Sequence, residues 1–344
     1  MKKILLSMIA LVCTMTAHAQ LSDRVSATLQ VGENSTIFYG FDAFKDAITA
    51  APSDAVSVIT LSPGAFNNPG NISKSVKIYG AGFLADNEKG ISATTVTGDL
   101  NIKSTEDDIP VIRMEGVYMN GNVLLTGSET ITGTEFVKCS WSGYYNRVET
   151  DNTIIRQCYI RSNINGESKK ATGFLVSNCY FNRIDGFAAG SGVSVNHCIL
   201  VDNYSQNGSY YYYGNIIDPG YAYPIQAGAT CYYNVGGNAK MSNGGNNAMF
   251  GNYDKEVWKS YKKLFADEQD DLKFLDADGN PRNWVLADPT AYVDAEGTPC
   301  GVTGGEFPWN PIPATPRIIS TSVDAKSEAG KLKVTIKAEA RPIE

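Results

Sequence analysis

The amino-acid sequence predicts an all-β fold, a parallel β-solenoid of about ten turns. The first observation is a repeat of about 20 residues, marked at steps of 19, 21 and 19 residues by Cys139, Cys158, Cys179 and Cys198. The second is an apolar residue three positions before and two positions after each of these cysteines, with a polar residue directly before it. The third is the composition of the repeat, short runs rich in β-branched residues separated by glycine and asparagine. A period of this length is too short for a βαβ unit and fits one coil of three short strands joined by three turns.

The register of the repeat predicts where each position points. Successive turns stack about 4.8 Å apart, so like residues lie above like. We expect the cysteines to face the interior as a column of free thiols, because parallel side chains do not match the roughly 90° torsion of a relaxed disulfide. The polar residue before each cysteine is expected in a bend that tolerates left-handed backbone; these residues are Lys138, Gln157, Asn178 and His197.

The chain begins with a pattern typical of a secretory signal peptide, expected over residues 1–19. Two lysines precede an apolar run over residues 4–12, and the small residues Ala17 and Ala19 come directly before the expected cleavage point after Ala19. No later stretch reaches the roughly 18 apolar residues that a membrane helix needs. We therefore expect an exported protein without membrane insertion, located in the periplasm, at the cell surface or outside the cell.

A cover is expected at the N-terminal end of the solenoid, because an open end exposes sheet edges and core. Residues 20–51 are expected to form this cap, with a short helix where apolar residues recur at helical spacing from Phe41. The coil itself is expected over residues 52–252. Within it, residues 204–226 are expected as an inserted loop, followed by one more turn that begins at Cys231.

The C-terminal part of the chain is expected to cover the other end. Residues 253–310 are predicted as a C-terminal cap with a helix from about Lys255, where apolar residues again follow helical spacing. Residues 311–344 are expected to hold the C-terminal strands, because residues 317–322 and 331–338 alternate between apolar and polar positions and predict a β-hairpin.

Segments near both ends of the chain resemble a known family. VITLSPGAF (residues 58–66) and ISKSVKIYGAG (residues 72–82) are similar to the opening of right-handed parallel β-helix proteins of the pectate-lyase-like superfamily. GVTGGEFPW (residues 301–309), with PRI (residues 316–318), is similar to the end of uncharacterised secreted bacterial members. The likeness spans about residues 27–340 and implies a right-handed coil. It implies no single activity, because the superfamily includes lyases, hydrolases and adhesins.

Charge and composition narrow the possible partners. The formal net charge is −7, without any basic tract, and phosphate backbones and anionic lipids are bound by clustered lysine and arginine. We therefore expect no nucleic-acid partner. Only two histidines occur, and His18 lies in the expected signal peptide, which excludes a multi-histidine metal site within one chain. The other, His197, is expected to be a turn residue that bonds its neighbours.

Four residues are candidates for catalysis on a polysaccharide. A lyase needs carboxylates for calcium and a basic group to remove a proton, and Asp185, Arg183, Asp202 and Arg161 fall on neighbouring turns. Asp185 and Asp202 also fit the separation of a glycosidase acid pair. The offsets do not reproduce a lyase pattern, so solvated surface charge is the interpretation we favour. No cofactor or metal is predicted, and calcium would be needed only by a lyase.

The most unusual feature is a concentration of tyrosines in the expected loop. Aromatic rings with a hydroxyl at the rim pack against sugar rings and donate hydrogen bonds. The alternative is that these side chains pack down on the rod. The candidate ligand-binding residues are Tyr204, Tyr210, Tyr211, Tyr212, Tyr213, Tyr221 and Tyr223.

The sequence thus favours non-catalytic binding of an extended polysaccharide to a lateral face of the coil. A polysaccharide lyase or glycoside hydrolase is the first alternative. A purely structural or adhesive surface protein is the second.

Overall fold

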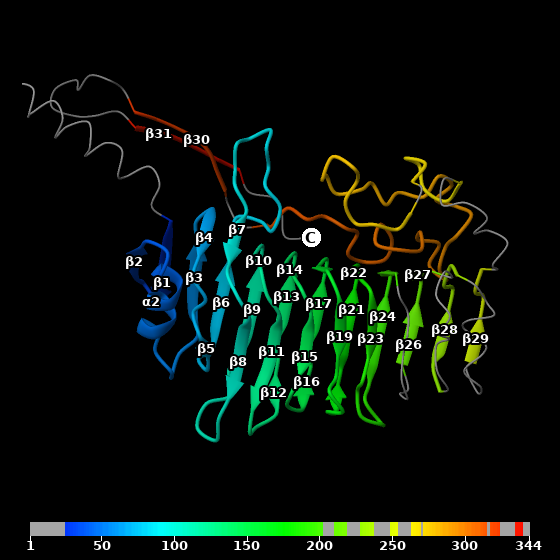
Figure 1. Cartoon of the computed structure of the whole chain (residues 1–344), viewed down its shortest axis with the longest axis horizontal. Coiled ribbons are helices and arrows are strands. Elements are labelled where there is room, and N and C mark those ends of the chain that lie inside the picture. Colours follow the sequence, from blue (N-terminus) through cyan, green and yellow to red (C-terminus); the bar gives the residue numbers. More distant parts are fainter. Residues whose placement is uncertain are drawn as a thin grey trace, which may run out of the picture.

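The computed structural model describes residues 25–201, 210–218, 228–236, 248–253, 263–269, 271–314, 317–323 and 334–339. These residues form a right-handed parallel β-helix, drawn out into a rod (Figure 1). The predicted fold class is therefore confirmed. The expected signal peptide and the helix from about Lys255 lie outside the described residues. None of the described helices is both long and apolar enough to span a membrane.

Three parallel sheets make up the walls of the coil, with the core between them. The first sheet has the strand order β2 (Asn34–Tyr39), β1 (Ser26–Val31), β3 (Ser57–Leu61), β6 (Val76–Tyr79), β9 (Ile112–Glu115), β13 (Glu135–Val137), β17 (Ile154–Arg156), β21 (Phe174–Ser177), β24 (Val193–Asn196), β26 (Tyr210–Tyr213), β28 (Thr230–Tyr232) and β29 (Ala248–Phe250). The second runs β4 (Gly64–Phe66), β7 (Thr94–Val96), β10 (Tyr118–Met119), β14 (Ser140–Trp141), β18 (Tyr159–Ile160), β22 (Tyr180–Phe181), β25 (Ile199–Leu200) and β27 (Ile216–Ile217). The third runs β5 (Asn71–Ile72), β8 (Leu100–Ser104), β11 (Val123–Gly127), β15 (Tyr144–Asn146), β19 (Asn163–Asn165) and β23 (Arg183–Asp185).

The number of turns is slightly smaller than expected. Among the described residues the second sheet has eight strands, so about eight turns contribute to both of the larger sheets, against the ten expected. A short additional sheet is formed by β12 (Ile131–Thr132), β16 (Thr150–Asp151) and β20 (Ala171–Thr172). The hairpin predicted near the C-terminus is present as β30 (Arg317–Val323) and β31 (Val334–Glu339).

A helix and an antiparallel pair of strands form the N-terminal end of the rod. Helix α2 (Ala43–Ala50) lies beside β1, β2 and β3 and buries one face, including Phe44 and Ile48, against the core. Strands β1 and β2 are antiparallel and extend the first sheet at this end. The amphipathic spacing that predicts a helix here is therefore used to bury apolar surface at the end of the coil.

The four cysteines of the repeat form the expected internal column. Each is fully buried and each is a free thiol. The backbone N–H of Cys139 donates to Cys158 Sγ at 3.4 Å, and the N–H of Cys158 donates to Cys179 Sγ at 3.3 Å. Burial raises the pKa of the Cys158 thiol well above its ordinary 9.0. The thiols act as small core groups that also accept a backbone hydrogen bond.

The column continues beyond Cys198 with asparagines, which corrects the expected inserted loop. Strand pairing aligns Asn215 with Cys198, followed by Asn234 and Asn252. Asn215 Oδ1 accepts the N–H of Cys198 at 2.7 Å, and Asn234 Oδ1 accepts the N–H of Asn215 at 3.0 Å. Residues 210–217 are therefore a regular turn containing β26 and β27 rather than part of a loop.

Cys231 does not belong to the column, so the register expected for that turn is wrong by three residues. It pairs with Tyr212 inside the first sheet, and Asn234 takes the column position instead. Both residue types present a small acceptor to the backbone of the neighbouring turn, because an asparagine carbonyl does what the cysteine sulfur does. A search for cysteine alone misses that equivalence.

The residue before each column position adopts the left-handed backbone that the sequence predicts. Lys138, Gln157, Asn178 and His197 have φ of 50°, 53°, 51° and 51°. Their side chains lie on the outside of the coil and are nevertheless buried. A distant part of the chain covers them.

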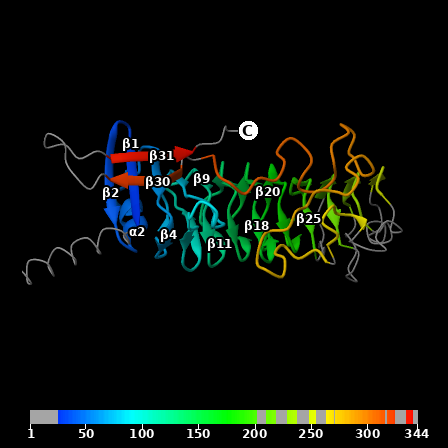
Figure 2. The same ribbon diagram turned by 90° about the horizontal axis from the view of Figure 1, so that it is seen from above.

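This cover is the return segment, residues 271–314, which runs back along the rod from its C-terminal end (Figures 1 and 2). From Asp294 onward, its contacts descend the coil as the residue number rises. Asp294 binds His197, Val302 O and Gly304 O accept from Asn178 Nδ2, and Ile312 O accepts from Lys138 Nζ at 3.0 Å. The row of left-handed residues is thus the attachment line of the return segment.

Candidate functional site

The four consecutive tyrosines of β26 alternate between core and surface. Tyr210 and Tyr212 are 1% and 0% exposed, whereas Tyr211 is 36% exposed. The alternation follows from strand geometry, since successive side chains point to opposite faces. Tyr210 and Tyr212, both expected to bind ligand, are therefore core residues, and Tyr211 and Tyr213 face outward. Tyr204, Tyr221 and Tyr223 lie outside the described residues.

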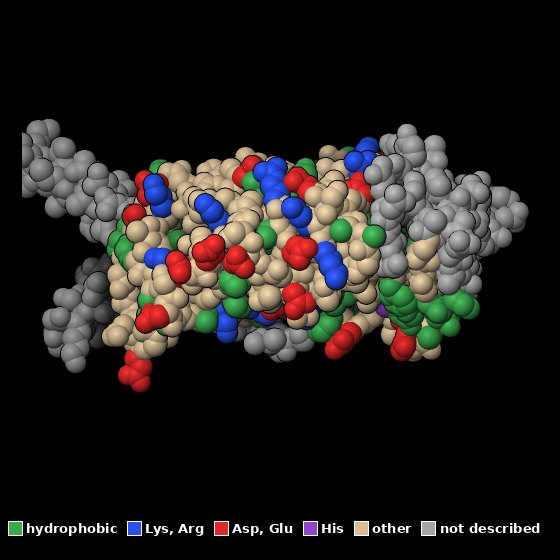
Figure 3. Space-filling model, turned by 90° about the horizontal axis from the view of Figure 1, so that it is seen from below, with side chains coloured by type: hydrophobic (Ala, Val, Ile, Leu, Met, Phe, Trp, Pro, Cys, Tyr) green, Lys and Arg blue, Asp and Glu red, His purple; other side chains and the backbone are tan. Residues whose placement is uncertain are grey.

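The outward tyrosines belong to a larger group, here called the aromatic surface: Tyr211, Tyr213, Tyr232, Tyr233 and Phe250. The rings of Tyr232 and Phe250 are 4.7 Å apart and parallel within 11°, and those of Tyr211 and Tyr232 are 5.5 Å apart. Phe250 is 51% exposed. Figure 3 shows hydrophobic side chains gathered at the C-terminal end of one face of the rod. Such a group of exposed aromatic residues on three adjacent strands marks a binding surface.

A shallow pocket of about 490 Å³ lies on the aromatic surface. Four of the tyrosines line it together with Asn196, Ala295 and Glu296. The hydroxyl of Tyr213 donates to the Glu296 carboxylate and accepts the N–H of Ala295 at 3.2 Å. Burial and the hydrogen bond to Glu296 raise the pKa of Tyr213. The return segment therefore supplies one wall of the pocket and an acidic side chain, Glu296.

Asn196 brings an amide to the same pocket. Its Oδ1 atom is buried and has no hydrogen-bond partner among the residues that the structure describes. A buried carbonyl oxygen without a partner costs free energy unless a ligand or water satisfies it. Neither Asn196 nor Glu296 stands out in the sequence, because neither belongs to the tyrosine run.

The aromatic side chains of the second sheet have a different environment. Tyr159 and Tyr180 point away from the coil but lie under the return segment. The ring of Tyr159 stacks on Phe274 at 3.7 Å, and Tyr180 contacts both Phe274 and Trp284. These residues belong to a second hydrophobic core between coil and return segment, and Tyr180 is only 6% exposed.

The residues considered for catalysis make separate contacts. Arg183 Nε and Asp185 Oδ2, on β23 of the third sheet, form an ion pair at 3.0 Å. Arg161 donates to Ser142 Oγ at 2.7 Å and to Met119 O at 3.1 Å, and lies over the ring of Tyr118. Asp202 lies outside the described residues. These contacts hold the Arg161 and Arg183 side chains against different sheets of the coil.

His197 takes part in a buried contact that superficially resembles a catalytic triad. Its Nε2 lies 3.0 Å from Asp294 Oδ2 and 3.4 Å from Thr298 Oγ1. A triad needs the carboxylate on one ring nitrogen and the nucleophile on the other. Here both partners approach Nε2, and Thr298 itself donates to Asp294 at 2.7 Å. The group therefore holds the return segment, and the histidine bonds a distant segment rather than its neighbours.

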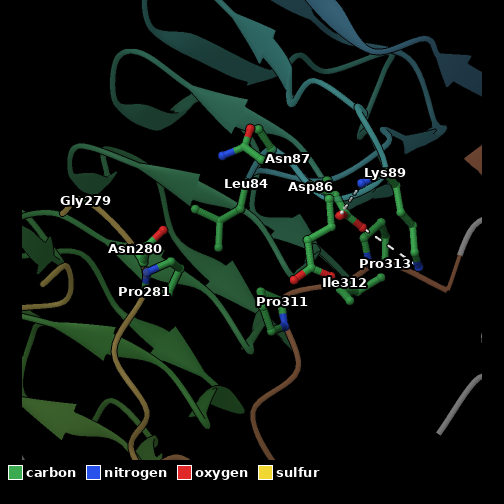
Figure 4. A pocket seen from close by; sticks show the side chains of 13 residues that line it. Leu84, Asp86, Asn87, Lys89, Gly279, Asn280, Pro281, Pro311, Ile312 and Pro313 are labelled. Atoms are coloured by element: carbon green, nitrogen blue, oxygen red, sulfur yellow. Dashed lines mark hydrogen bonds and ion pairs between the residues drawn. The ribbon is translucent and has the colours of Figure 1, made fainter. Parts of the chain in front are cut away.

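A second pocket, of about 500 Å³, lies nearer the N-terminal end between residues 82–89 and the return segment (Figure 4). Leu84, Pro281 and Pro311 contribute apolar walls, and an ion pair of 3.9 Å joins Asp86 and Lys89 at one side. The described residues contain no group of three or more histidine, cysteine, aspartate or glutamate side chains able to hold a metal ion. Mixed charges and proline rings do not indicate one ligand class.

Comparison with known proteins finds no match: no family model, no curated protein and no solved structure is significantly similar to the chain. The comparisons therefore do not support the expected likeness to the pectate-lyase-like superfamily, and the structure itself shows the parallel β-helix fold. The site has to be interpreted from its own geometry.

Proposed function

We propose that the protein binds an extended polysaccharide, without cleaving it, through the aromatic surface. The observation that carries the proposal is the pocket lined by four outward tyrosines together with Asn196 and Glu296. Aromatic rings pack against the C–H groups of sugars, while hydroxyl, amide and carboxylate groups bond the sugar hydroxyls.

The shape of the surface suits a polymer. Tyr213, Tyr232 and Phe250 occupy one row of paired positions on three adjacent strands, so their contacts repeat along the rod axis. Adjacent strands are about 4.8 Å apart, which brings neighbouring rings within reach of consecutive parts of one chain. An extended ligand would gain from each step of this repeat.

The proposal is non-catalytic because the described acid and base candidates are engaged elsewhere. Asp185 pairs with Arg183 on the third sheet, whereas the aromatic surface lies on the first sheet. Glu296 is the single carboxylate among the described residues that line the pocket. Glycosidases of the common retaining and inverting classes use two.

We also propose that the chain is exported and related to uncharacterised secreted β-helix proteins of the pectate-lyase-like superfamily. The signal-like pattern of residues 1–19 and the segments quoted above support this proposal. Secretion is tested by expressing the full chain and identifying the N-terminus of the mature protein, which is expected to begin at Gln20.

A glycan array tests the binding function. The wild type is compared with a Tyr211→Ala/Tyr232→Ala double variant and with Tyr39→Ala, a matched control because Tyr39 is 61% exposed on the first sheet but at its other end. We expect the double variant to lose at least about tenfold in affinity, equal to about 1.4 kcal/mol, and the control to bind like the wild type.

Two outcomes would overturn the proposal. Equal glycan binding by wild type and double variant would assign the surface a structural or adhesive role. Release of reducing ends or unsaturated products from a bound polysaccharide would show that the protein is an enzyme.

A further inference from the structure

The aromatic surface carries a charge pattern that limits the class of polysaccharide it accepts. Among the residues that the structure describes, Glu296 is the only charged side chain that lines its pocket, and no described lysine or arginine contributes to the lining. Polyuronates and sulfated glycans carry an anionic group on most sugars. Their recognition requires clustered basic side chains, as for other polyanions.

The nearest arginine in the same row is too distant to compensate. Strand pairing runs from Arg156 to Ser177, Asn196 and then Tyr213, a separation of three strand steps. At about 4.8 Å a step this is roughly 14 Å, beyond the Debye length of about 8 Å at physiological salt.

That arginine is also neutralised locally. Arg156 Nη2 pairs with Glu135 Oε1 at 3.1 Å, and the guanidinium lies over the ring of Phe307 in the return segment. Arg113, further along the sheet, pairs with both Glu115 and Glu135. Both arginines are therefore paired with carboxylates, several strand steps away from the aromatic surface.

The environment of Tyr211 also disfavours negative charge. Burial and the neighbouring groups, Glu296 among them, raise the pKa of Tyr211. An environment that disfavours a phenolate also disfavours a ligand carboxylate.

The groups that remain fit sugar hydroxyls. The tyrosine hydroxyls both donate and accept, and a carboxylate accepts from two adjacent hydroxyls. The Asn196 amide offers an Oδ1 atom that has no hydrogen-bond partner within the described part of the chain. We infer that the aromatic surface recognises an uncharged polysaccharide and excludes polyuronates. This inference rests on the proposed function and specifies its ligand class.

The test compares three classes of polymer by affinity electrophoresis and calorimetry on the full chain. The probes are uncharged polymers (xyloglucan, galactomannan and hydroxyethylcellulose), anionic polygalacturonate and cationic chitosan. We expect Tyr211- and Tyr232-dependent binding to an uncharged polymer that is insensitive to salt. Polygalacturonate is expected to bind at least about tenfold more weakly.

A Glu296→Gln variant tests the electrostatic cause, because glutamine retains the oxygen that accepts from Tyr213. We expect its residual affinity for polygalacturonate at low salt to rise at least about threefold over that of the wild type. Glu88→Gln is the matched control, an exposed acid at the second pocket, and is expected to change nothing.

The outcomes separate the two proposals. Tyrosine-dependent binding of polygalacturonate as tight as that of an uncharged polymer would overturn the ligand class but leave polysaccharide binding intact. A chitosan preference above about tenfold that disappears in Glu296→Gln would assign a cationic ligand instead. If the affinity for polygalacturonate does not increase in Glu296→Gln, the carboxylate of Glu296 is not what disfavours anionic ligands. Absence of tyrosine-dependent binding to any polymer would overturn the proposed function and this inference together.

Discussion

The outer faces of the first and second sheets carry similar aromatic residues, but the return segment buries only those of the second sheet. On the second sheet, Tyr159 and Tyr180 lie under Phe274 and Trp284 of the return segment. On the first sheet, Tyr211 and its neighbours remain exposed, and the return segment touches only their edge, through Ala295 and Glu296.

The difference teaches that an outward aromatic residue on a solenoid has no fixed role. Tyr180 is 6% exposed and Tyr211 is 36% exposed, although both point away from the coil. Tyr180 is buried under the return segment and therefore contributes to stability, because apolar area removed from water stabilises the fold. Tyr211 is exposed and therefore remains available to a ligand.

The largest expected effect comes from the covered face. Trp284→Ala removes a 2% exposed side chain that contacts both Tyr180 and Phe265. We expect the free energy of unfolding to fall by about 3–5 kcal/mol, as is typical for truncating a buried large aromatic residue. Guanidinium denaturation, followed by far-ultraviolet circular dichroism of the backbone, measures this free energy of unfolding. A decrease in the free energy of unfolding of less than about 1 kcal/mol would show that the second hydrophobic core contributes little to stability.

The attachment line of the return segment is expected to give an intermediate effect. Asn178→Gly keeps the left-handed backbone but removes Nδ2, which donates to Val302 O at 3.0 Å and Gly304 O at 2.7 Å. We expect a loss of about 1–3 kcal/mol and faster proteolysis within residues 294–312.

The matched control is Asn152→Gly, an exposed asparagine with φ of 53° that makes no contact with the return segment among the described residues. Equal proteolysis rates for the two variants would argue against the attachment line.

The His197 contact predicts a pH dependence. Burial lowers the pKa of His197 below its ordinary 6.5, although the Asp294 carboxylate acts in the opposite direction. The unfolded chain therefore binds this proton more readily than the folded chain does. The free energy of unfolding is expected to be highest above pH 6.5 and to fall as the pH is lowered through the folded-state pKa.

Urea midpoints measured between about pH 8 and about pH 5 check this dependence. His197→Asn, which tolerates left-handed backbone, is expected to flatten the curve. A slope unchanged by the substitution would locate the titrating group elsewhere.

The smallest effect on stability is expected on the open face. Tyr211→Ala removes a partly exposed side chain, so the free energy of unfolding is expected to change by less than about 1 kcal/mol. Thermal denaturation of this variant beside Trp284→Ala checks the contrast directly. Comparable losses of stability in the two variants would show that the exposed and covered faces do not differ in their contribution to the fold.

Sequence patterns predicted much of the coil because its repeat is local. The spacing of Cys139, Cys158, Cys179 and Cys198 predicted one column, and the structure places them in it. Positions flanking each cysteine correctly predicted buried side chains such as Phe136 and Ile160. The same pattern failed at Asn215 and Cys231, because the hydrogen-bonding role of the column position is shared by two unlike residue types.

The candidate site was predicted only in part, for a related reason. Tyr211 and Tyr213 were among the predicted residues, but so were Tyr210 and Tyr212, which the strand turns inward. Recognising Asn215 as a column position would have identified residues 210–213 as a strand and separated the two pairs. Glu296 could not be predicted, because it is separated from Tyr213 by 83 residues and meets it only through the path of the return segment.

The sequence by itself determined the coil, its inward cysteines and its row of left-handed residues, because strand alternation and turn stacking relate residues one turn apart. The tertiary structure alone decided which aromatic residues stay exposed. Whether an outer face is covered depends on where a segment about 100 residues away packs with the most favourable free energy. His197 and Asp294, which are in contact, are 97 residues apart. No local periodicity encodes that choice, since it is made by the apolar area and hydrogen bonds that the two distant surfaces bury together.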